Sequence, residues 1–289
     1  MDSVRRKLDL WALADVPPET WPTGWPTGAR EMLLGVLRDA DATASDLHLA
    51  GELVCRMPRV DDRWAQELLS AVQRADLPEA TRAKGAIPLG PLLAAAELEG
   101  FDDCSYPPVA EDVFRRAQTV LYDLYANPDE PRLLRLHALE AFAHAPEERL
   151  ETAIRTAYAG DDDWRAAAVR CMFFHDGFEP EIIESLSSEN LAIRSAALKA
   201  AGPCELEEAW PHIHAVLKSP TGAPKPLLLA AIDSIGLIRP EEAQHLVQDL
   251  VSSNDEDIAR AAKQSLAFVL WPLAHWQVED DGPCRGGNA

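Results

Sequence analysis

The sequence lacks features that mark most nucleic-acid-binding proteins and several large enzyme classes. Among its 289 residues only 27 are Lys or Arg, against 48 Asp or Glu, so the formal net charge is −21. Binding of DNA and RNA phosphates depends on Lys and Arg, and this balance therefore argues against a nucleic-acid partner. The motifs GxSxG, GxxxxGK[ST] and GxGxxG are also absent. We therefore predict no catalytic residues, no enzyme activity and no cofactor.

Cysteine is scarce and scattered, and long apolar runs are missing. The five cysteines form no CxxC pair, which argues against a zinc knuckle or a thioredoxin-type site; they are Cys55, Cys104, Cys171, Cys204 and Cys284. No apolar stretch is long enough to span a membrane, and the first residues contain no long apolar segment of the signal-peptide kind. These observations predict a cytoplasmic protein with no membrane partner.

Histidine spacing argues against a metal site. His212 and His214 are two residues apart, which places them on nearly opposite sides of a helix. His137 and His144 share a helix face but are two turns apart, about 10 Å along the axis. That separation is too long for one ion, so we predict no metal ligand.

What the sequence does contain is aliphatic side chains in a helical pattern. Hydrophobic residues make up 47% of the chain but aromatic residues only 7%, so Ala, Leu, Val and Ile dominate the apolar set. Few runs of β-branched residues interrupt it, and this composition favours helix over sheet.

A repeat of about thirty residues organises the C-terminal half. Five segments are alike: LRLHALEAF (134–142), WRAAAVRCM (164–172), IRSAALKAA (193–201), LLLAAIDSI (227–235) and IARAAKQSL (258–266). We number each segment from its second residue, position zero: Arg135, Arg165, Arg194, Leu228 and Ala259. The steps between these residues are 30, 29, 34 and 31, and the longest step contains the Pro/Gly-rich loop 219–226.

Each segment predicts an amphipathic helix with a defined start. Positions −1, +3, +4 and +7 share a face with zero and are mostly apolar, whereas +2 and +6 are small in nearly every copy. Position −4 holds an N-cap residue or a proline: Asp161, Asn190, Asp255, Pro131 and Pro224. Further helices are expected between the segments, at 146–159, 179–187, 205–218 and 240–252. The earlier half predicts helices at 29–39, 45–57, 61–75, 78–99 and 109–126.

Helical hairpins with one apolar face must stack to bury it. The core pattern R-x-A-A-L-x-A-A, seen at 194–201, resembles the short HEAT repeat of the bilin-lyase type. The stretches 77–103 and 225–243 resemble a group of bacterial HEAT-repeat proteins, and the resemblance extends over about 25–267. It implies an all-α fold, a right-handed α-solenoid of HEAT-like helical hairpins. We expect an N-terminal lead-in and cap at 1–28, the solenoid at 29–276 with its clearest repeats at 129–270, and a disordered acidic tail at 277–289.

The arginines at position zero allow two interpretations. They could form an anion-binding row, but they lie toward the packed face and have acidic or amide caps nearby. HEAT-like stacks commonly join neighbouring repeats through Arg–Asp ladders. We therefore predict a structural ladder made of Arg135, Arg165, Arg194, Asp161, Asn190 and Asp255.

Position +5 points away from the predicted core. It holds Glu140, Arg170, Lys199 and Asp233, and His137 lies beside it. In this fold the second helix of each hairpin usually lines the concave surface, so we predict that these five residues contact a partner. A solvated helix face explains the same pattern. The mixed signs of charge favour a protein or peptide partner over a polyanion.

Tryptophan marks both ends of the predicted stack. WPTG occurs twice in tandem, beginning at Trp21 and Trp25, and Trp271 and Trp276 follow the last repeat segment. Such residues can cover the exposed apolar ends of a solenoid. They can equally form docking points, because Trp is enriched at binding hot spots.

The sequence leads to the hypothesis of a non-catalytic interaction or scaffold module that binds a protein or peptide; it leaves the oligomeric state open. Two alternatives remain. The resemblance permits a bilin-lyase-type enzyme or enzyme partner, and the acidic charge permits an inhibitor or immunity-type protein for a basic target. A HEAT-like DNA-repair glycosylase would need a basic groove, against which the net charge of −21 argues.

Overall fold

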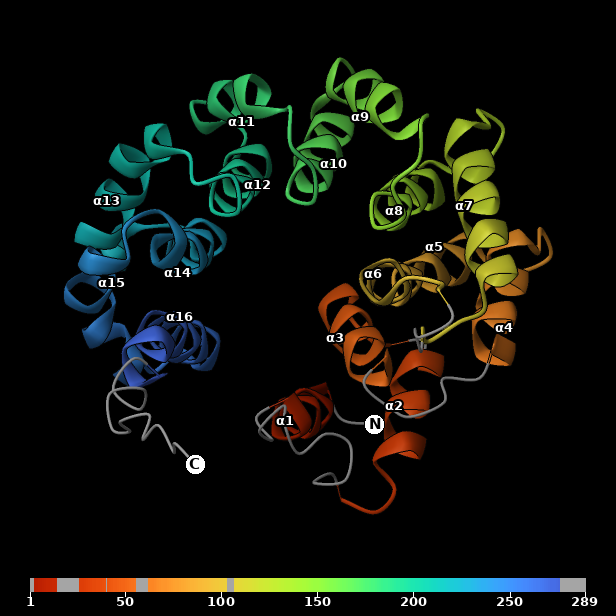
Figure 1. The fold of residues 1–289 in the computed structure, drawn as a ribbon, viewed down its shortest axis with the longest axis horizontal. Coiled ribbons are helices and arrows are strands. Elements are labelled where there is room, and N and C mark those ends of the chain that lie inside the picture. The colour runs from red at the N-terminus through yellow and green to blue at the C-terminus, as the bar shows by residue number, and fades with distance from the viewer. Residues whose placement is uncertain (1–2, 15–25, 40, 56–61, 103–106, 276–289) are drawn as a thin grey trace, which may run out of the picture. The chain divides into compact units, whose positions relative to one another are not determined.

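The computed structural model describes residues 3–14, 26–39, 41–55, 62–102 and 107–275. Within these ranges the secondary structure is helical and contains no strand. The chain divides into two compact units, Met1–Ala157 and Tyr158–Ala289, which we name unit 1 and unit 2. The predicted all-α class is therefore confirmed (Figure 1).

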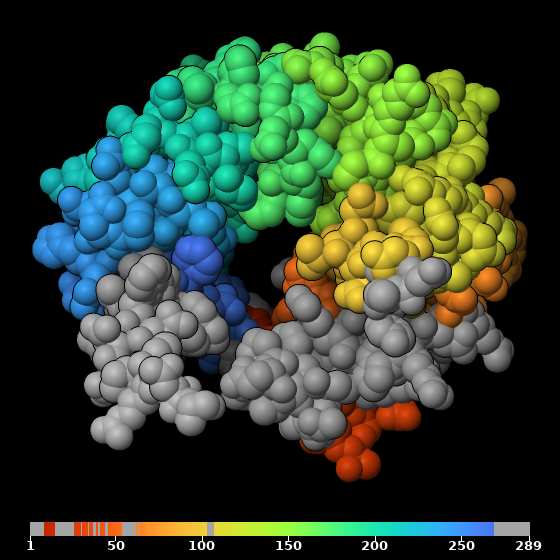
Figure 2. All heavy atoms as spheres, viewed as in Figure 1, coloured from red at the N-terminus to blue at the C-terminus, as the bar shows by residue number. Residues whose placement is uncertain are grey.

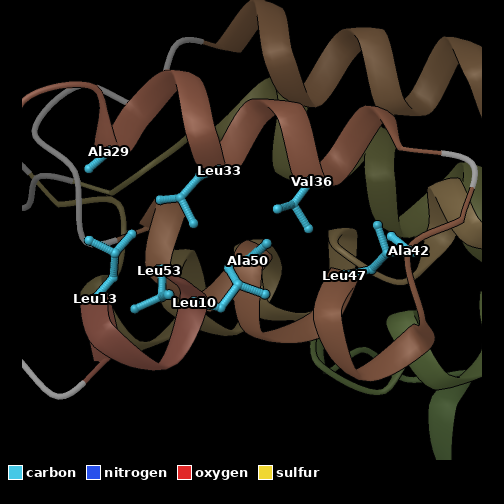
Figure 3. Packing of buried hydrophobic residues seen from close by; sticks show 9 residues of the cluster. All are labelled: Leu10, Leu13, Ala29, Leu33, Val36, Ala42, Leu47, Ala50 and Leu53. Carbon is cyan, nitrogen blue, oxygen red and sulfur yellow. The ribbon is translucent and has the colours of Figure 1, made fainter. Parts of the chain in front are cut away.

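Unit 1 begins with three helices that share one apolar core. They are α1 (Ser3–Ala14), α2 (Ala29–Arg38) and α3 (Ala44–Cys55), and α3 packs against both of the others. Nine buried side chains meet between them (Figure 3): Leu10, Leu13, Ala29, Leu33, Val36, Ala42, Leu47, Ala50 and Leu53. Within each helix their spacing of three or four residues places them on one face, and Ala42 lies just before α3. The predicted lead-in thus contains a helix, and Leu10 and Leu13 anchor it in the core.

The rest of unit 1 continues with packed helices. They are α4 (Asp62–Gln73), α5 (Glu79–Ala86), α6 (Leu89–Glu99), α7 (Glu111–Ala126), α8 (Arg132–Phe142) and α9 (Leu150–Tyr158), the last residue of which belongs to unit 2. Helix α5 packs against α4 and α8, and α6 packs against α3. The prediction of one helix over 78–99 is wrong, because α5 ends before Ile87 and Pro88. Pro88 has no N–H to donate and disfavours helical geometry at the preceding residue.

Unit 2 consists of two layers of helices. Its helices are α10 (Asp162–Met172), α11 (Glu179–Leu186), α12 (Leu191–Ala201), α13 (Trp210–Lys218), α14 (Lys225–Ile238), α15 (Pro240–Val247) and α16 (Glu256–His275). Helices α10, α12, α14 and α16 pack side by side in this order and form one layer, which we name the second-helix layer. Helices α11, α13 and α15 cover its other side as the first-helix layer (Figure 1).

Small side chains allow the helices of the second-helix layer to approach one another. The residues at +2 and +6 are buried in α10, α12 and α14, as in Ala167 with Cys171 and Ala230 with Ser234. The hydroxyl of Ser234 reaches the carbonyl oxygen of Leu198 on α12 at 2.7 Å. With all heavy atoms drawn, side chains close the gaps between neighbouring ribbons (Figure 2).

The predicted helices agree with the structure in position, but several of their predicted ends differ from the observed ones. Each of the five repeat segments lies within α8, α10, α12, α14 or α16. The predicted helix at 205–218 begins as the short 3-10 helix η2 (Glu207–Ala209), and that at 240–252 ends as η4 (Gln248–Ser252). The loop 219–226 contains a third, η3 (Pro220–Gly222). In the ranges that the structure describes, no helix combines the length and apolarity needed to cross a bilayer.

Candidate functional site

The predicted contact residues at +5 fall into two groups. In unit 1, His137 and Glu140 lie one turn apart on α8, and their side chains are 20% and 27% exposed. His137 Nδ1 is 3.3 Å from Glu140 Oε2, so the two groups pair with each other when the imidazole is protonated. This pair is half-buried and offers a partner only part of each side chain.

In unit 2, the +5 residues are exposed on consecutive helices. Arg170 lies on α10, Lys199 on α12 and Asp233 on α14. Lys199 Nζ is 3.0 Å from Asp233 Oδ2, and their side chains are 52% and 43% exposed. An exposed ion pair of this kind contributes little to folding stability. Both groups are therefore accessible to a partner, although they carry no net charge together.

The arginines at position zero bind backbone carbonyl groups within their own hairpins. Arg135 Nε donates to the carbonyl of Tyr125 at 2.9 Å, and Arg165 Nε donates to that of Tyr158 at 3.1 Å. Arg194 Nη1 donates to the carbonyl of Ser188 at 3.3 Å. These carbonyl groups lie at or just beyond the end of the preceding helix, where they have no intrahelical donor and where a cation is favoured by the helix dipole.

Two of the tyrosines whose carbonyl groups bind these arginines also contact the following hairpin through their hydroxyl groups. The hydroxyl of Tyr125 donates to the carbonyl of Ala153 on α9 at 3.0 Å, inside unit 1. The hydroxyl of Tyr158 lies 3.2 Å from the carbonyl of Glu181 on α11, inside unit 2. The backbone carbonyl of each tyrosine thus accepts a hydrogen bond from an arginine, and its hydroxyl donates one to the first helix of the next hairpin. The hydrogen bonds of these arginines join a second helix to the end of the helix before it, and the predicted Arg–Asp ladder stays a prediction.

The cap residues of the predicted ladder lie at the starts of the second helices. Asp161, Asn190 and Asp255 each accept backbone N–H bonds from the first turn that follows. Bonds also join successive starts: Asn190 Nδ2 donates to Asp162 Oδ2 at 3.0 Å, and Lys225 Nζ donates to Asp255 at 2.7 Å. The Lys225 bond lowers the pKa of the Asp255 carboxyl and is also the main reason why the pKa of Lys225 is raised.

Sequence reasoning missed a further arginine of the same type. Arg82 on α5 donates through Nε to the carbonyl of Val72 on α4 at 2.9 Å, and its Nη1 is 2.8 Å from Glu130. Pro78 stands four residues before Arg82, as Pro131 stands before Arg135. That spacing was a usable signal. It was obscured because α6 lies between this hairpin and the next one and lengthens the step to Arg135.

Most of the tryptophans predicted at the two ends lie outside the residues that the structure describes. Trp21, Trp25 and Trp276 lie outside the described residues. Trp271 lies within α16, although the position of its side chain is not described. Their proposed roles as caps or docking points stay predictions.

An exposed apolar row in unit 2 was also missed. Phe174, Leu237 and Phe268 are 44%, 37% and 58% exposed, and each stands at +9 in its segment. The same position after α12 holds Pro203, which is also exposed. Single exposed apolar side chains are ordinary, but recurrence at one register position is not. The compared segments end at +7, and extending the comparison by two residues would have revealed the row.

A scan against protein-family models finds no match, and a search of curated proteins finds none either. The exposed face of unit 2 is therefore the basis for inferring a function.

Within the described ranges, no three His, Cys, Asp or Glu side chains are placed to hold one metal ion. Burial raises the pKa of the Cys204 thiol, and the negative charges of Glu179 and Asp176 raise it further. A thiol with a raised pKa is a poor nucleophile near neutral pH. The arrangement is suited to contact with another molecule through apolar and charged side chains.

Proposed function

We propose that this chain is a non-catalytic interaction module, built from HEAT-like hairpins stacked as a right-handed solenoid, that binds a protein or peptide. The repeated bonds within and between hairpins support this reading, because they hold successive second helices in one register. The regular step near thirty residues supports it as well.

One observation carries the proposal: an exposed face that repeats from helix to helix in unit 2. Along this face, position +5 holds Arg170, Lys199 and Asp233, and position +9 one turn later holds the apolar row. Apolar side chains next to accessible charges of both signs are typical of protein-binding surfaces. Binding through this face needs no reactive side chain.

Lysine footprinting after affinity capture tests the proposal. Tagged full-length protein is used to capture partners from cells of its source, and each complex is treated with an acylating reagent. We expect a bound partner to protect Lys199, on the second-helix layer, at least several-fold. Lys218 is the matched control, because it is also exposed but lies at the end of α13 in the first-helix layer.

Capture of no protein in repeated experiments would contradict the proposal. So would a partner that protects Lys218 while leaving Lys199 as reactive as in the free chain.

A further inference from the structure

The apolar row lies along one edge of the second-helix layer. Bonds between Asp162 and Asn190 and between Lys225 and Asp255 join the starts of these helices, so their C-terminal ends lie on the opposite edge. Each +9 residue stands 13 residues after the cap or proline at position −4, which is just beyond the end of α10 and α12, near the end of α14 and within α16. We name the four residues at +9, which are Phe174, Pro203, Leu237 and Phe268, together with the neighbouring Phe173 at +8, the edge row.

Close packing holds members of the edge row in place. The rings of Phe173 and Phe174 meet edge to face, with centroids 4.8 Å apart. Leu237 lies against Gly202, where an added Cβ would be 3.0 Å from Leu237 Cδ1. Leu237 and the two phenylalanine rings thus have packed neighbours while a large part of each side chain stays in solvent. Such a surface loses little conformational entropy when a partner covers it.

Acidic linkers follow the edge row. The segments 175–179, 204–208 and 239–242 follow the C-terminal part of a second helix and run into the first residues of α11, η2 and α15. Together they carry seven carboxylates: Asp176, Glu179, Glu205, Glu207, Glu208, Glu241 and Glu242. The same segments contain one Arg and no Lys, and that residue, Arg239, is 2.5 Å from Glu207 and 3.5 Å from Glu241. Within these three segments the negative charge is therefore only partly compensated.

Two parts of this edge are close enough to influence each other. The charges of Glu179 and Asp176, from the linker after α10, act on the thiol of Cys204, which directly follows Pro203. Carboxylates of one linker thus lie near the edge-row position of the next helix. A partner that covers the edge row would therefore meet apolar side chains and negative charges side by side.

We propose that the edge row binds a basic amphipathic segment of a partner protein, with apolar side chains on the row and Lys or Arg facing the linkers. This inference rests on the proposed function and specifies which kind of partner segment the surface binds. An acidic segment or a polyphosphate would be repelled by the linker carboxylates. A second copy of this chain is disfavoured as occupant for the same reason, since each copy carries a net charge of −21.

Peptide selection tests this inference. A displayed library of random peptides of about 16 residues, roughly four helical turns, is selected on the immobilised full-length protein. We expect the recovered peptides to combine Lys or Arg with Leu, Ile or Phe at helical spacing. Fluorescence anisotropy then measures the Kd of the most frequent peptide, labelled with a dye, for each variant.

Three variants separate the two contributions. The double variant Phe174→Ser with Leu237→Ser is expected to raise Kd at least about tenfold, which corresponds to about 1.4 kcal/mol. The triple variant Asp176→Asn, Glu208→Gln and Glu242→Gln should weaken binding mainly at low salt, because salt screens the same attraction. Leu98→Ser removes an even more exposed apolar side chain from α6 in unit 1 and should leave Kd unchanged. Circular dichroism checks that every variant is folded.

The outcomes distinguish this inference from the proposed function. Peptides without basic residues, or peptides that bind the double variant as tightly as the unaltered protein, overturn the inference and leave a protein-binding role elsewhere on the chain intact. Failure to enrich any peptide, together with a negative capture experiment, contradicts both. Basic amphipathic peptides that lose affinity only when the edge is altered support both.

Discussion

At the scale of single residues, the buried guanidinium of Arg82 joins three elements of unit 1. It lies on α5, bonds the last turn of α4 through Val72 and pairs with Glu130 just before α8. Its side chain is 6% exposed and that of Glu130 is 21% exposed. A buried ion pair contributes modestly as a whole, but removal of one partner leaves the other charge uncompensated.

Replacement of this arginine should therefore be costly. We expect Arg82→Met to lower the free energy of unfolding of unit 1 by about 3 kcal/mol, measured by urea denaturation and circular dichroism. Adding Glu130→Gln removes the isolated carboxylate and should restore part of the loss. The control Arg74→Met breaks an exposed pair with Asp76 and should leave the urea midpoint nearly unchanged. Equal effects of Arg82→Met and Arg74→Met would contradict the structural role assigned to Arg82.

At the scale of elements, glycine determines how closely α6 approaches the end of α8. A Cβ added to Gly90 on α6 would lie 2.8 Å from Cδ2 of His144, closer than real Cβ contacts allow. Gly35 on α2 is different, because nothing lies within 4 Å of its added Cβ. The two glycines therefore separate the effect of helix packing from that of helix propensity.

Opposite effects are expected when each glycine is replaced by alanine. Gly90→Ala should destabilise unit 1 by about 1–3 kcal/mol, because overpacking forces neighbours to move. Gly35→Ala should stabilise it by about 0.5–1 kcal/mol through helix propensity. In a His144→Ala background, the loss caused by Gly90→Ala should disappear. Thermal and urea unfolding measure all four proteins, and a loss that persists without the imidazole would disprove the proposed contact.

The elements were largely predictable from the sequence, whereas their connections were not. Apolar spacing and the caps Asp161 and Asn190 are local signals, so they placed α10 and α12 within two residues. Arg165 could be recognised as inward-facing, but its acceptor on Tyr158 lies on another helix and depends on how the hairpin closes. Phe174 and Leu237 were passed over because they follow the segments that were compared, and exposure depends on tertiary packing.

At the scale of the whole molecule, self-repulsion opposes the compact state. The chain carries 48 acidic and 27 basic side chains, and charges of one sign destabilise a folded protein as they are brought together. The exposed pairs, such as Lys199 with Asp233, compensate this repulsion only locally and contribute little each. The chain divides into two compact units, a division that sequence periodicity did not reveal, and the single repeat region at 29–276 stays a prediction.

Salt should therefore stabilise the protein. Between about 0.01 M and 0.15 M NaCl, the screening length falls from about 30 Å to about 8 Å, and we expect the Tm to rise. Scanning calorimetry or circular dichroism measures it. A variant with Glu207, Glu208, Glu241 and Glu242 changed to Gln serves as the control and should respond less. A Tm that falls with added salt would show that ion pairs outweigh repulsion.

The arginine bonds have a consequence for how such a chain can change in length. Arg165 and Arg194 each find their acceptor inside their own hairpin, so the bond moves with the hairpin when its coding segment is copied. Duplication or deletion of one period of about thirty residues would leave no arginine without its acceptor. Such a chain can gain or lose whole hairpins while each remaining arginine of this type keeps the carbonyl group that it binds.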